Sequence, residues 1–210
     1  MKIAILISSL LLLGGCSSNH TVTTWKTQHI IPSSYHRIMV VAILPDEDSM
    51  ARDQIETSFS TALANMGYNT VTAISEFGRT GLKNLGEDET YNKLYDKGID
   101  AVVTVALVNK TKESSSTPVA ARTYRNNFYF NRIFQYKDNL TQPGNNSLFE
   151  EYYWECILFD LNKLEASIAV QTPPSSKPAQ LKMGDQLARH LIKRMARDKT
   201  LQKQRPLKAF

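Results

Sequence analysis

The first half of the chain opens with a strongly apolar run that is followed by an amphipathic stretch. The run IMVVAIL starts at Ile38 and is closed by Pro45, and its continuous apolar, β-rich character is typical of a strand covered on both faces. Ser49 is a residue type that caps helices, and Gly67 is one that ends them. The sequence therefore predicts a helix between these two residues. The apolar side chains spaced for its buried face are Ile55, Phe59, Ala62, Leu63 and Met66.

Two further strand-like segments follow, separated by a second helical segment. Residues 68–74 predict a strand, and residues 87–97 predict a short helix that ends at Gly98. The run DAVVTVALV at 100–108 predicts another strand, apolar on both faces. This βαβαβ order favours a parallel sheet, because each crossover between strands carries a helix.

The second half predicts a β-hairpin and a closing helix. Residues 151–161 and 165–172 are strand-like, and a short turn around Asn162 and Lys163 joins them. After the proline-rich TPPSSKP, residues 179–197 predict an amphipathic helix. Its apolar face holds Leu187, Leu191 and Met195. The predicted fold class is α/β, a layered sandwich with a mixed sheet built as βαβαβ followed by a β-hairpin and a C-terminal helix.

The N-terminus has the layout of a secretory signal. Lys2 precedes an apolar run over 3–13 that only two serines interrupt, and small residues follow. A helix needs about 20 apolar residues to cross a bilayer, so this run is too short to remain as a membrane helix. The sequence LGGC at 13–16 resembles the bacterial lipobox.

The lipobox resemblance implies a lipid anchor on Cys16. In lipoproteins with this motif the cysteine thiol receives a diacylglycerol, the signal is cut before it, and the new amino group is acylated, commonly with palmitate. Two or three acyl chains anchor a protein firmly. Ser17 stands where an aspartate favours retention in the inner membrane, so the resemblance implies an outer-membrane lipoprotein whose domain faces the periplasm. The alternative is a secreted protein with a chance cysteine near its cleavage site.

Removal of the signal leaves 195 of the 210 residues, a length that suits one domain. The segment after Cys16 is rich in Ser, Thr and His and is interpreted as a tether, in which Trp25 could lie at the lipid interface or dock on the domain. The expected organisation is a signal peptide at 1–15, a lipidated N-terminus and tether at 16–37, a single α/β domain at 38–198 and a basic tail at 199–210.

Few residues form a recognisable chemical site. The histidines and cysteines have no metal-ligand spacing, and the sequence holds neither a GxSxG elbow nor a phosphate-binding GxxxxGK[ST]. We therefore expect no metal, no cofactor and no enzymatic activity. Cys156 stands among aromatic and aliphatic neighbours and is interpreted as a buried small hydrophobe. Arg52 and Glu56, four residues apart on the predicted helix, are interpreted as a surface ion pair.

A second resemblance covers roughly residues 37–198. It is carried by the apolar first strand, by Arg52 and Glu56 on a helix that ends in MGY, and by the segments KGIDAVVTVAL and YYWECILFDLNKLEASIAVQT. These look like a group of small bacterial lipoproteins of unassigned activity. Their domain is similar in plan to the periplasmic domain of the curli secretion channel lipoprotein and the N-terminal domain of the TolB protein. The resemblance implies a role in envelope assembly, secretion or protein contact rather than catalysis.

An insertion over about 111–149 is long for a compact domain. Within it, YRNNFYFNRIFQY places aromatic side chains at alternate positions, which is the pattern of a strand with one aromatic face. The segment could cover the domain's own core, dock a partner protein, or supply a hairpin to a shared barrel as in the curli channel. The candidate partner surface comprises Tyr124, Phe128, Tyr129, Phe130, Phe134 and Tyr136.

The C-terminal segment RHLIKRMARDKTLQKQRPLKAF holds eight Lys or Arg and one Asp, in a chain whose formal net charge is +5. Such a segment attracts anionic surfaces, here phospholipid headgroups, lipopolysaccharide or cell-wall polymers, whereas no nucleic acid partner is expected in the periplasm. The alternative is a solvated helix face whose charge suits the helix dipole. The candidate anionic-surface contacts are Arg197, Lys199, Lys203, Arg205 and Lys208.

These features favour a lipid-anchored, non-catalytic binding or assembly module of the bacterial cell envelope. Its expected partners are the membrane, through the lipid on Cys16, and an envelope protein. The alternative is a subunit of an oligomeric secretion or assembly pore, which requires association into a homo-oligomer.

Overall fold

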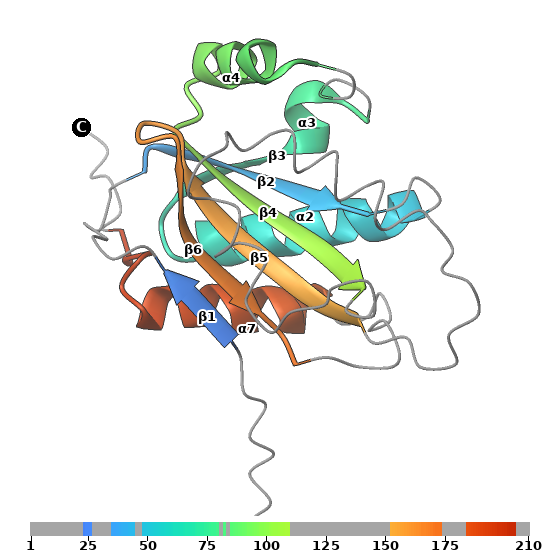
Figure 1. The fold of residues 1–210 in the computed structure, drawn as a ribbon, viewed down its shortest axis with the longest axis vertical. Helices are drawn as coiled ribbons and strands as arrows, with labels where there is room; N and C mark the ends of the chain where they lie inside the picture. The colour runs from blue at the N-terminus through green and yellow to red at the C-terminus, as the bar shows by residue number, and fades with distance from the viewer. Residues whose placement is uncertain are drawn as a thin grey trace, which may run out of the picture.

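The fold is built on one mixed sheet. The computed structural model describes residues 23–26, 35–44, 48–79, 82, 85–109, 152–173 and 184–204. The strands of this part of the chain form a six-stranded sheet in the order β1-β6-β5-β4-β2-β3 (Figure 1). They are β1 (Thr23–Lys26), β2 (Arg37–Ile43), β3 (Asn69–Thr72), β4 (Ala101–Asn109), β5 (Tyr152–Asp160) and β6 (Glu165–Gln171). The helices are α2 (Ser49–Ala64), α3 (Ala73–Phe77), α4 (Glu87–Asp96) and α7 (Gly184–Arg197).

The sheet has a parallel half and an antiparallel half. β2 pairs in parallel with β3 and β4, whereas β5 pairs antiparallel with β4 and β6, and β1 antiparallel with β6. The hairpin turn is held by Asp160, whose Oδ1 accepts hydrogen bonds from the backbone N–H groups of Asn162 and Lys163 at 3.0 and 3.1 Å. The predicted α/β class with a mixed sheet and a C-terminal helix is confirmed.

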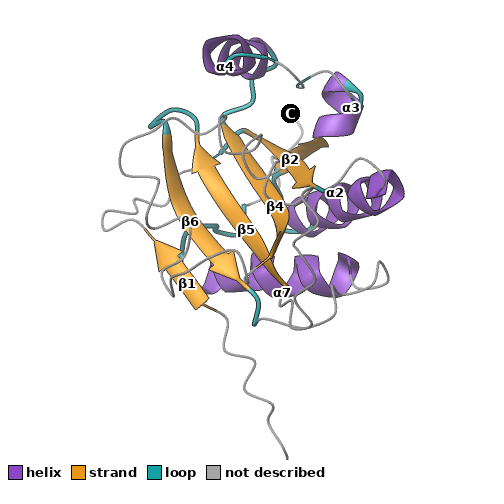
Figure 2. Ribbon diagram, turned by 45° about the vertical axis from the view of Figure 1, so that its right-hand side comes forward, coloured by secondary structure: helices purple, strands orange, loops and turns teal. Residues whose placement is uncertain are grey.

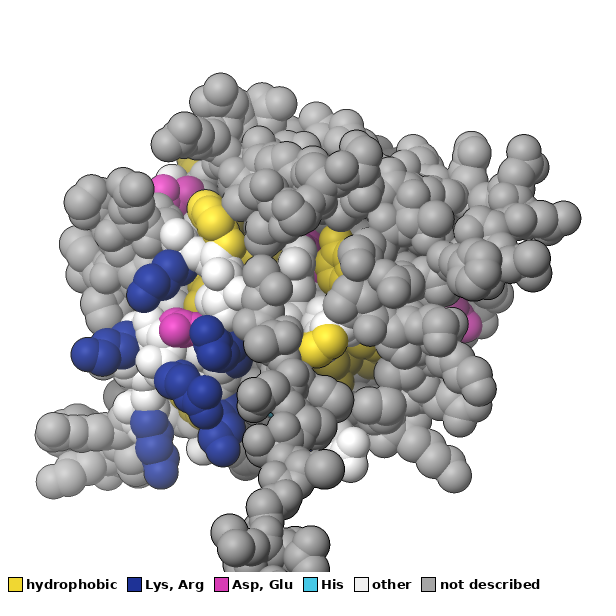
Figure 3. Space-filling view, turned by 60° about the horizontal axis from the view of Figure 1, so that its bottom comes forward, with side chains coloured by type: hydrophobic (Ala, Val, Ile, Leu, Met, Phe, Trp, Pro, Cys, Tyr) yellow, Lys and Arg dark blue, Asp and Glu magenta, His cyan; other side chains and the backbone are white. Residues whose placement is uncertain are grey.

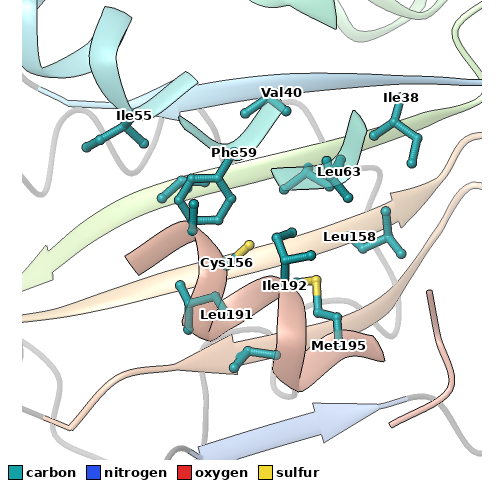
Figure 4. Close-up of a cluster of buried hydrophobic side chains, with 14 of the residues drawn as sticks. Ile38, Val40, Ile55, Phe59, Leu63, Cys156, Leu158, Leu191, Ile192 and Met195 are labelled. Atoms are coloured by element: carbon teal, nitrogen blue, oxygen red, sulfur yellow. The ribbon is translucent and has the colours of Figure 1, made fainter. Parts of the chain in front are cut away.

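α2 and α7 lie side by side on one face of the sheet (Figure 2). Phe59 and Leu63 of α2 and Leu191 and Met195 of α7 are fully buried there, and Figure 4 shows them gathered around Cys156 of β5. The apolar faces predicted for both helices are therefore confirmed. On the same cluster, Ile55 and Leu187 are buried, and Ala62 and Met66 are partly buried.

α3 and α4 lie at one end of the sheet, over its other face (Figure 1). Leu94 of α4 is fully buried and belongs to a second apolar cluster that includes Met39 and Phe159. Trp25 of β1 is partly buried and packs against this cluster. Of the two positions considered for Trp25, the structure shows docking on the domain.

The segment after β3 differs from the expectation of a strand over 68–74. Thr72 Oγ1 accepts a hydrogen bond from the N–H of Ser75 at 3.1 Å, and Ser75 Oγ accepts one from the N–H of Thr72 at 3.2 Å. This reciprocal capping box starts α3 at Ala73 and therefore ends the strand at Thr72.

The beginnings of α2 and α7 also differ from expectation. Ser49 lies inside the first turn of α2, and Asp48 takes the cap position without a side-chain hydrogen bond, so the prediction of Ser49 as the cap is wrong. α7 begins at Gly184, and residues 179–183 of the predicted helix lie outside the described part of the chain. Ser58 of α2 donates a hydrogen bond to Asp185, which ties the start of α7 to α2.

The folded domain includes residues that we expected outside 38–198. Residues 23–26, expected within the tether, form the edge strand β1. At the other end, Leu201 is 1% exposed, and the N–H of Gln204 donates a hydrogen bond to the oxygen of Met66 at 2.8 Å. The first residues of the expected basic tail therefore pack on the domain at the end of α2.

Gly67→Ala should lower the free energy of unfolding by about 3 kcal/mol, against about 1 kcal/mol for Gly98→Ala. Both glycines have positive φ, at +93° and +65°, but a Cβ at Gly67 would lie 2.8 Å from the backbone oxygen of Gln204, whereas Gly98 has open space around it. Urea denaturation measures both losses. Equal losses would contradict the close contact between Gly67 and the C-terminal segment.

Candidate functional site

Glu56 of α2 is a buried carboxylate that joins three elements of the fold. Its side chain is 1% exposed. Oε1 accepts a hydrogen bond from the N–H of Ala42 in β2, and Oε2 accepts one from the N–H of Ile74 in α3, each at 3.1 Å. Both oxygens therefore satisfy backbone donors, and a buried backbone donor without a partner would destabilise the fold.

The interpretation of Arg52 and Glu56 as a surface ion pair is wrong, because Glu56 lies in the interior. Arg52 is partly buried, and its Nη2 donates a hydrogen bond to the oxygen of Leu44 at 2.9 Å. Burial raises the pKa of Glu56 from 4.5 to about 7, while the two backbone hydrogen bonds and the positive charge of Arg52 oppose this rise. The carboxylate of Glu56 therefore connects α2 to β2 and α3 and titrates near neutral pH.

The outward face of α7 is basic. Arg189, Lys193 and Arg197 are all exposed and follow one another at intervals of four residues. They form a row on the side of α7 opposite its buried face. Figure 3 looks at the molecule from the α7 side and shows Lys and Arg side chains grouped there. We call this row, together with Lys26 of β1, the basic face.

β1 is attached to α7 as well as to β6. Arg194 Nε donates a hydrogen bond to Thr24 Oγ1 at 2.9 Å and also lies 3.0 Å from Asp198 Oδ2. Thr24 and Lys26 point to the same side of the sheet, because alternate residues of a strand share a face, whereas Trp25 points to the other side. The exposed side chain of Lys26 therefore lies on the α7 side of the molecule.

The helix α4, at the opposite end of the domain, is acidic. The α4 sequence EDETYNKLYD holds four acidic residues and one lysine. Tyr95 of α4 is 68% exposed and stacks on Tyr91, with 6.2 Å between the ring centroids. Figure 1 shows α4 at the end of the sheet away from α7. The helix α4 is therefore acidic, whereas the outward face of α7 is basic.

Three of the predicted anionic-surface residues lie in the described part of the chain, and all are exposed: Arg197, Lys199 and Lys203. Arg197 belongs to the basic face, whereas Lys203 lies beyond the buried Leu201, in the segment that packs at the end of α2. Arg205 and Lys208 lie outside the described residues.

The list of contacts predicted from the sequence leaves out three members of the basic face. Arg189 and Lys193 carried a visible signal, because they stand at intervals of four before Arg197 and opposite the predicted apolar face. Lys26 carried no such signal, because the pairing of β1 with β6 decides its place.

The other predicted site residues lie outside the described part of the chain. They are the lipid-attachment residue Cys16 and the candidate partner surface of Tyr124, Phe128, Tyr129, Phe130, Phe134 and Tyr136.

Cys156 is fully buried, and burial raises the pKa of its thiol well above the usual value. This confirms its interpretation as a small buried hydrophobe. Among the described residues, no group of three or more His, Cys, Asp or Glu could hold a metal ion. None of the helices in the same ranges combines the length and apolarity that crossing a bilayer requires.

Comparison with known proteins gave no match to a family model or to a curated protein. Two solved structures of PelC dodecamers from Paraburkholderia phytofirmans resemble the chain distantly. One covers 88% of this chain and 100% of its own, with a TM-score of 0.43 and 10% identity. The other, a point variant, covers 82% of this chain and 96% of its own, with a TM-score of 0.41 and 11% identity. The similarity is too low for the dodecameric assembly of those proteins to be assigned to this chain. The function of this chain must therefore be inferred from its own residues.

The stability of the fold should fall by about 3 kcal/mol between pH 5 and pH 8 because of Glu56, relative to Glu56→Gln. The pKa of this group is about 7 in the folded protein and 4.5 as its ordinary value, so the folded state holds the proton more tightly. Its contribution is complete below pH 4.5 and is lost as the pH rises through 7. Urea denaturation of both proteins at the two pH values measures this, and parallel pH dependences would contradict it.

Proposed function

We propose that this protein is a lipid-anchored module of the bacterial cell envelope that acts by binding. In this proposal Cys16 carries the lipid and the domain faces the periplasm from the outer membrane. The observation that carries the proposal is the position of β1, because the chain enters the folded sheet only seven residues after Cys16.

The short connection would hold the domain close to its membrane. Seven residues of fully extended chain reach at most about 25 Å. Because β1 is hydrogen-bonded to β6 and tied to α7 through Arg194, the anchor would be coupled to the folded domain rather than to a long free arm. This arrangement suits a protein that must work next to a bilayer.

The fold uses Glu56 as a structural group and not as a catalytic one. A catalytic carboxyl group needs a free oxygen directed toward a substrate. Both oxygens of Glu56 accept backbone hydrogen bonds in the interior, although its pKa lies in the range useful for proton transfer.

The surface that supports binding is the outer side of α4. Tyr95 is exposed there among acidic residues, and aromatic side chains are enriched at interfaces.

Replacement of Cys16 should release the protein from the membrane. Cys16→Ser removes the thiol that would form the thioether to the lipid, so we expect loss of labelling by radioactive palmitate and a shift from the membrane to the soluble periplasmic fraction. Cys156→Ala is the matched control, because it removes the other cysteine and should leave both readouts unchanged. Membrane retention of Cys16→Ser at the wild-type level would contradict the anchor.

A photoreactive residue at Tyr95 or Tyr129 should capture an envelope protein in intact cells. Tyr95 tests the exposed aromatic of α4, Tyr129 tests the aromatic insertion, and Met50, which is 82% exposed on α2, is the control position. We expect one protein adduct from Tyr95 or Tyr129 that is absent from Met50, identified by mass spectrometry. Adducts between copies of this chain alone would indicate self-assembly instead, and no adduct from either position would contradict a protein partner at these surfaces.

A further inference from the structure

We propose that the basic face lies against the anionic phospholipid headgroups of the leaflet that holds the anchor, and thereby fixes the orientation of the domain on the membrane. The inference rests on the proposed function, because it assumes a lipid on Cys16. It adds a second membrane contact, made by the folded domain itself.

The geometry of α7 suits a flat anionic surface. Arg189, Lys193 and Arg197 succeed one another at roughly one turn of helix, so the row extends over about 12 Å along the helix axis. Among the described residues, none forms an ion pair with these three side chains, whereas Arg194 on the flank of the helix is paired with Asp198. The row therefore has its charge available for an external partner.

The basic face adjoins β1, the first described strand after Cys16. Arg194 holds Thr24 against α7, and Lys26 lies on the same side of β1 as Thr24. These contacts between β1 and α7 thus place the row beside the first described strand after Cys16. An anchored domain that turned α7 toward the bilayer would place four cations near the headgroups without lengthening the connection to Cys16.

The acidic helix α4 favours the same orientation. α4 carries four acidic residues and one lysine at the end of the sheet away from α7. An anionic surface attracts the basic face and repels α4, so both interactions turn the molecule in the same direction. Screening restricts these forces to about 10 Å at 0.1 M salt, and the short connection keeps the domain near the surface. A phospholipid leaflet is therefore favoured over a soluble anionic polymer, which would give no reason for the basic face to adjoin β1.

The first experiment separates this contact from the lipid anchor. The full mature chain from residue 16, carrying Cys16→Ser, is sedimented with vesicles of phosphatidylglycerol and phosphatidylcholine, and with vesicles of phosphatidylcholine alone. We expect binding to the anionic vesicles at low salt and its loss at about 1 M salt, where the screening length falls to about 3 Å. Combining Arg189→Gln, Lys193→Gln and Arg197→Gln should weaken this binding on the order of 100-fold, since each cation contributes roughly a factor of five.

The matched control combines Arg79→Gln, Lys97→Gln and Lys163→Gln, which removes the same charge from exposed positions outside the basic face. Each of these pairs with an acidic residue of the domain, so their loss should leave vesicle binding within about twofold. Thermal melting confirms that both triple variants are folded. An equal loss in the two triple variants, or wild-type binding by the α7 variant, would overturn the proposal.

The second experiment measures orientation in the lipidated protein. A fluorescent donor is attached to Gln186→Cys on α7 or to Asn92→Cys on α4, both exposed, while the buried Cys156 stays unlabelled. The protein is inserted into vesicles that contain phosphatidylglycerol and an acceptor-labelled lipid. We expect stronger energy transfer from Gln186→Cys than from Asn92→Cys, and convergence of the two in high salt. Equal transfer at low salt would refute the orientation, whereas failure of the protein to acquire a lipid would refute the anchor and leave the vesicle-binding result standing.

Discussion

The buried carboxylate of Glu56 is the constraint on which the arrangement of the fold depends. It fixes α2 to β2 through Ala42 and fixes the start of α3 through Ile74. An apolar side chain of the same size could fill the space, but it would leave the buried N–H of Ala42 and the partly buried N–H of Ile74 without this acceptor. α7 packs against α2, and β1 is tied to α7, so the position of the basic face derives from the placement of α2.

Hydrophobic periodicity was sufficient to predict the elements whose burial decides their structure. β2, α2, β4, the hairpin of β5 and β6, and the apolar side of α7 all follow from it. Hydrophobic periodicity does not predict which polar side chains form hydrogen bonds with backbone groups far away in the sequence. Glu56 looks like half of a surface ion pair in sequence, and Asp100, whose carboxylate accepts the N–H groups of His36 and Arg37, has no local pattern at all.

β1 shows a different limit of sequence reasoning. The segment TTWK is short and polar, and it becomes a strand because β6 offers it an unpaired edge. The position of the segment after α7 also depends on residues far away in the sequence. This segment packs on the domain at the end of α2, where Gly67 leaves room for Gln204. The candidate site was therefore predictable in its chemistry, a group of exposed cations, but its residues were predictable only along α7.

The position of β1 also has a mechanical consequence. Any load that pulls a lipidated N-terminus away from the domain reaches this four-residue edge strand before it reaches the core. While β1 is paired, the connection from Cys16 to Thr23 reaches at most about 25 Å, whereas after separation of β1 from β6 the chain from Cys16 to Tyr35 would have a contour of about 65 Å. The paired edge strand would thus limit the distance between the membrane and the domain. Its separation from β6 would allow a much larger distance without unfolding the rest of the sheet.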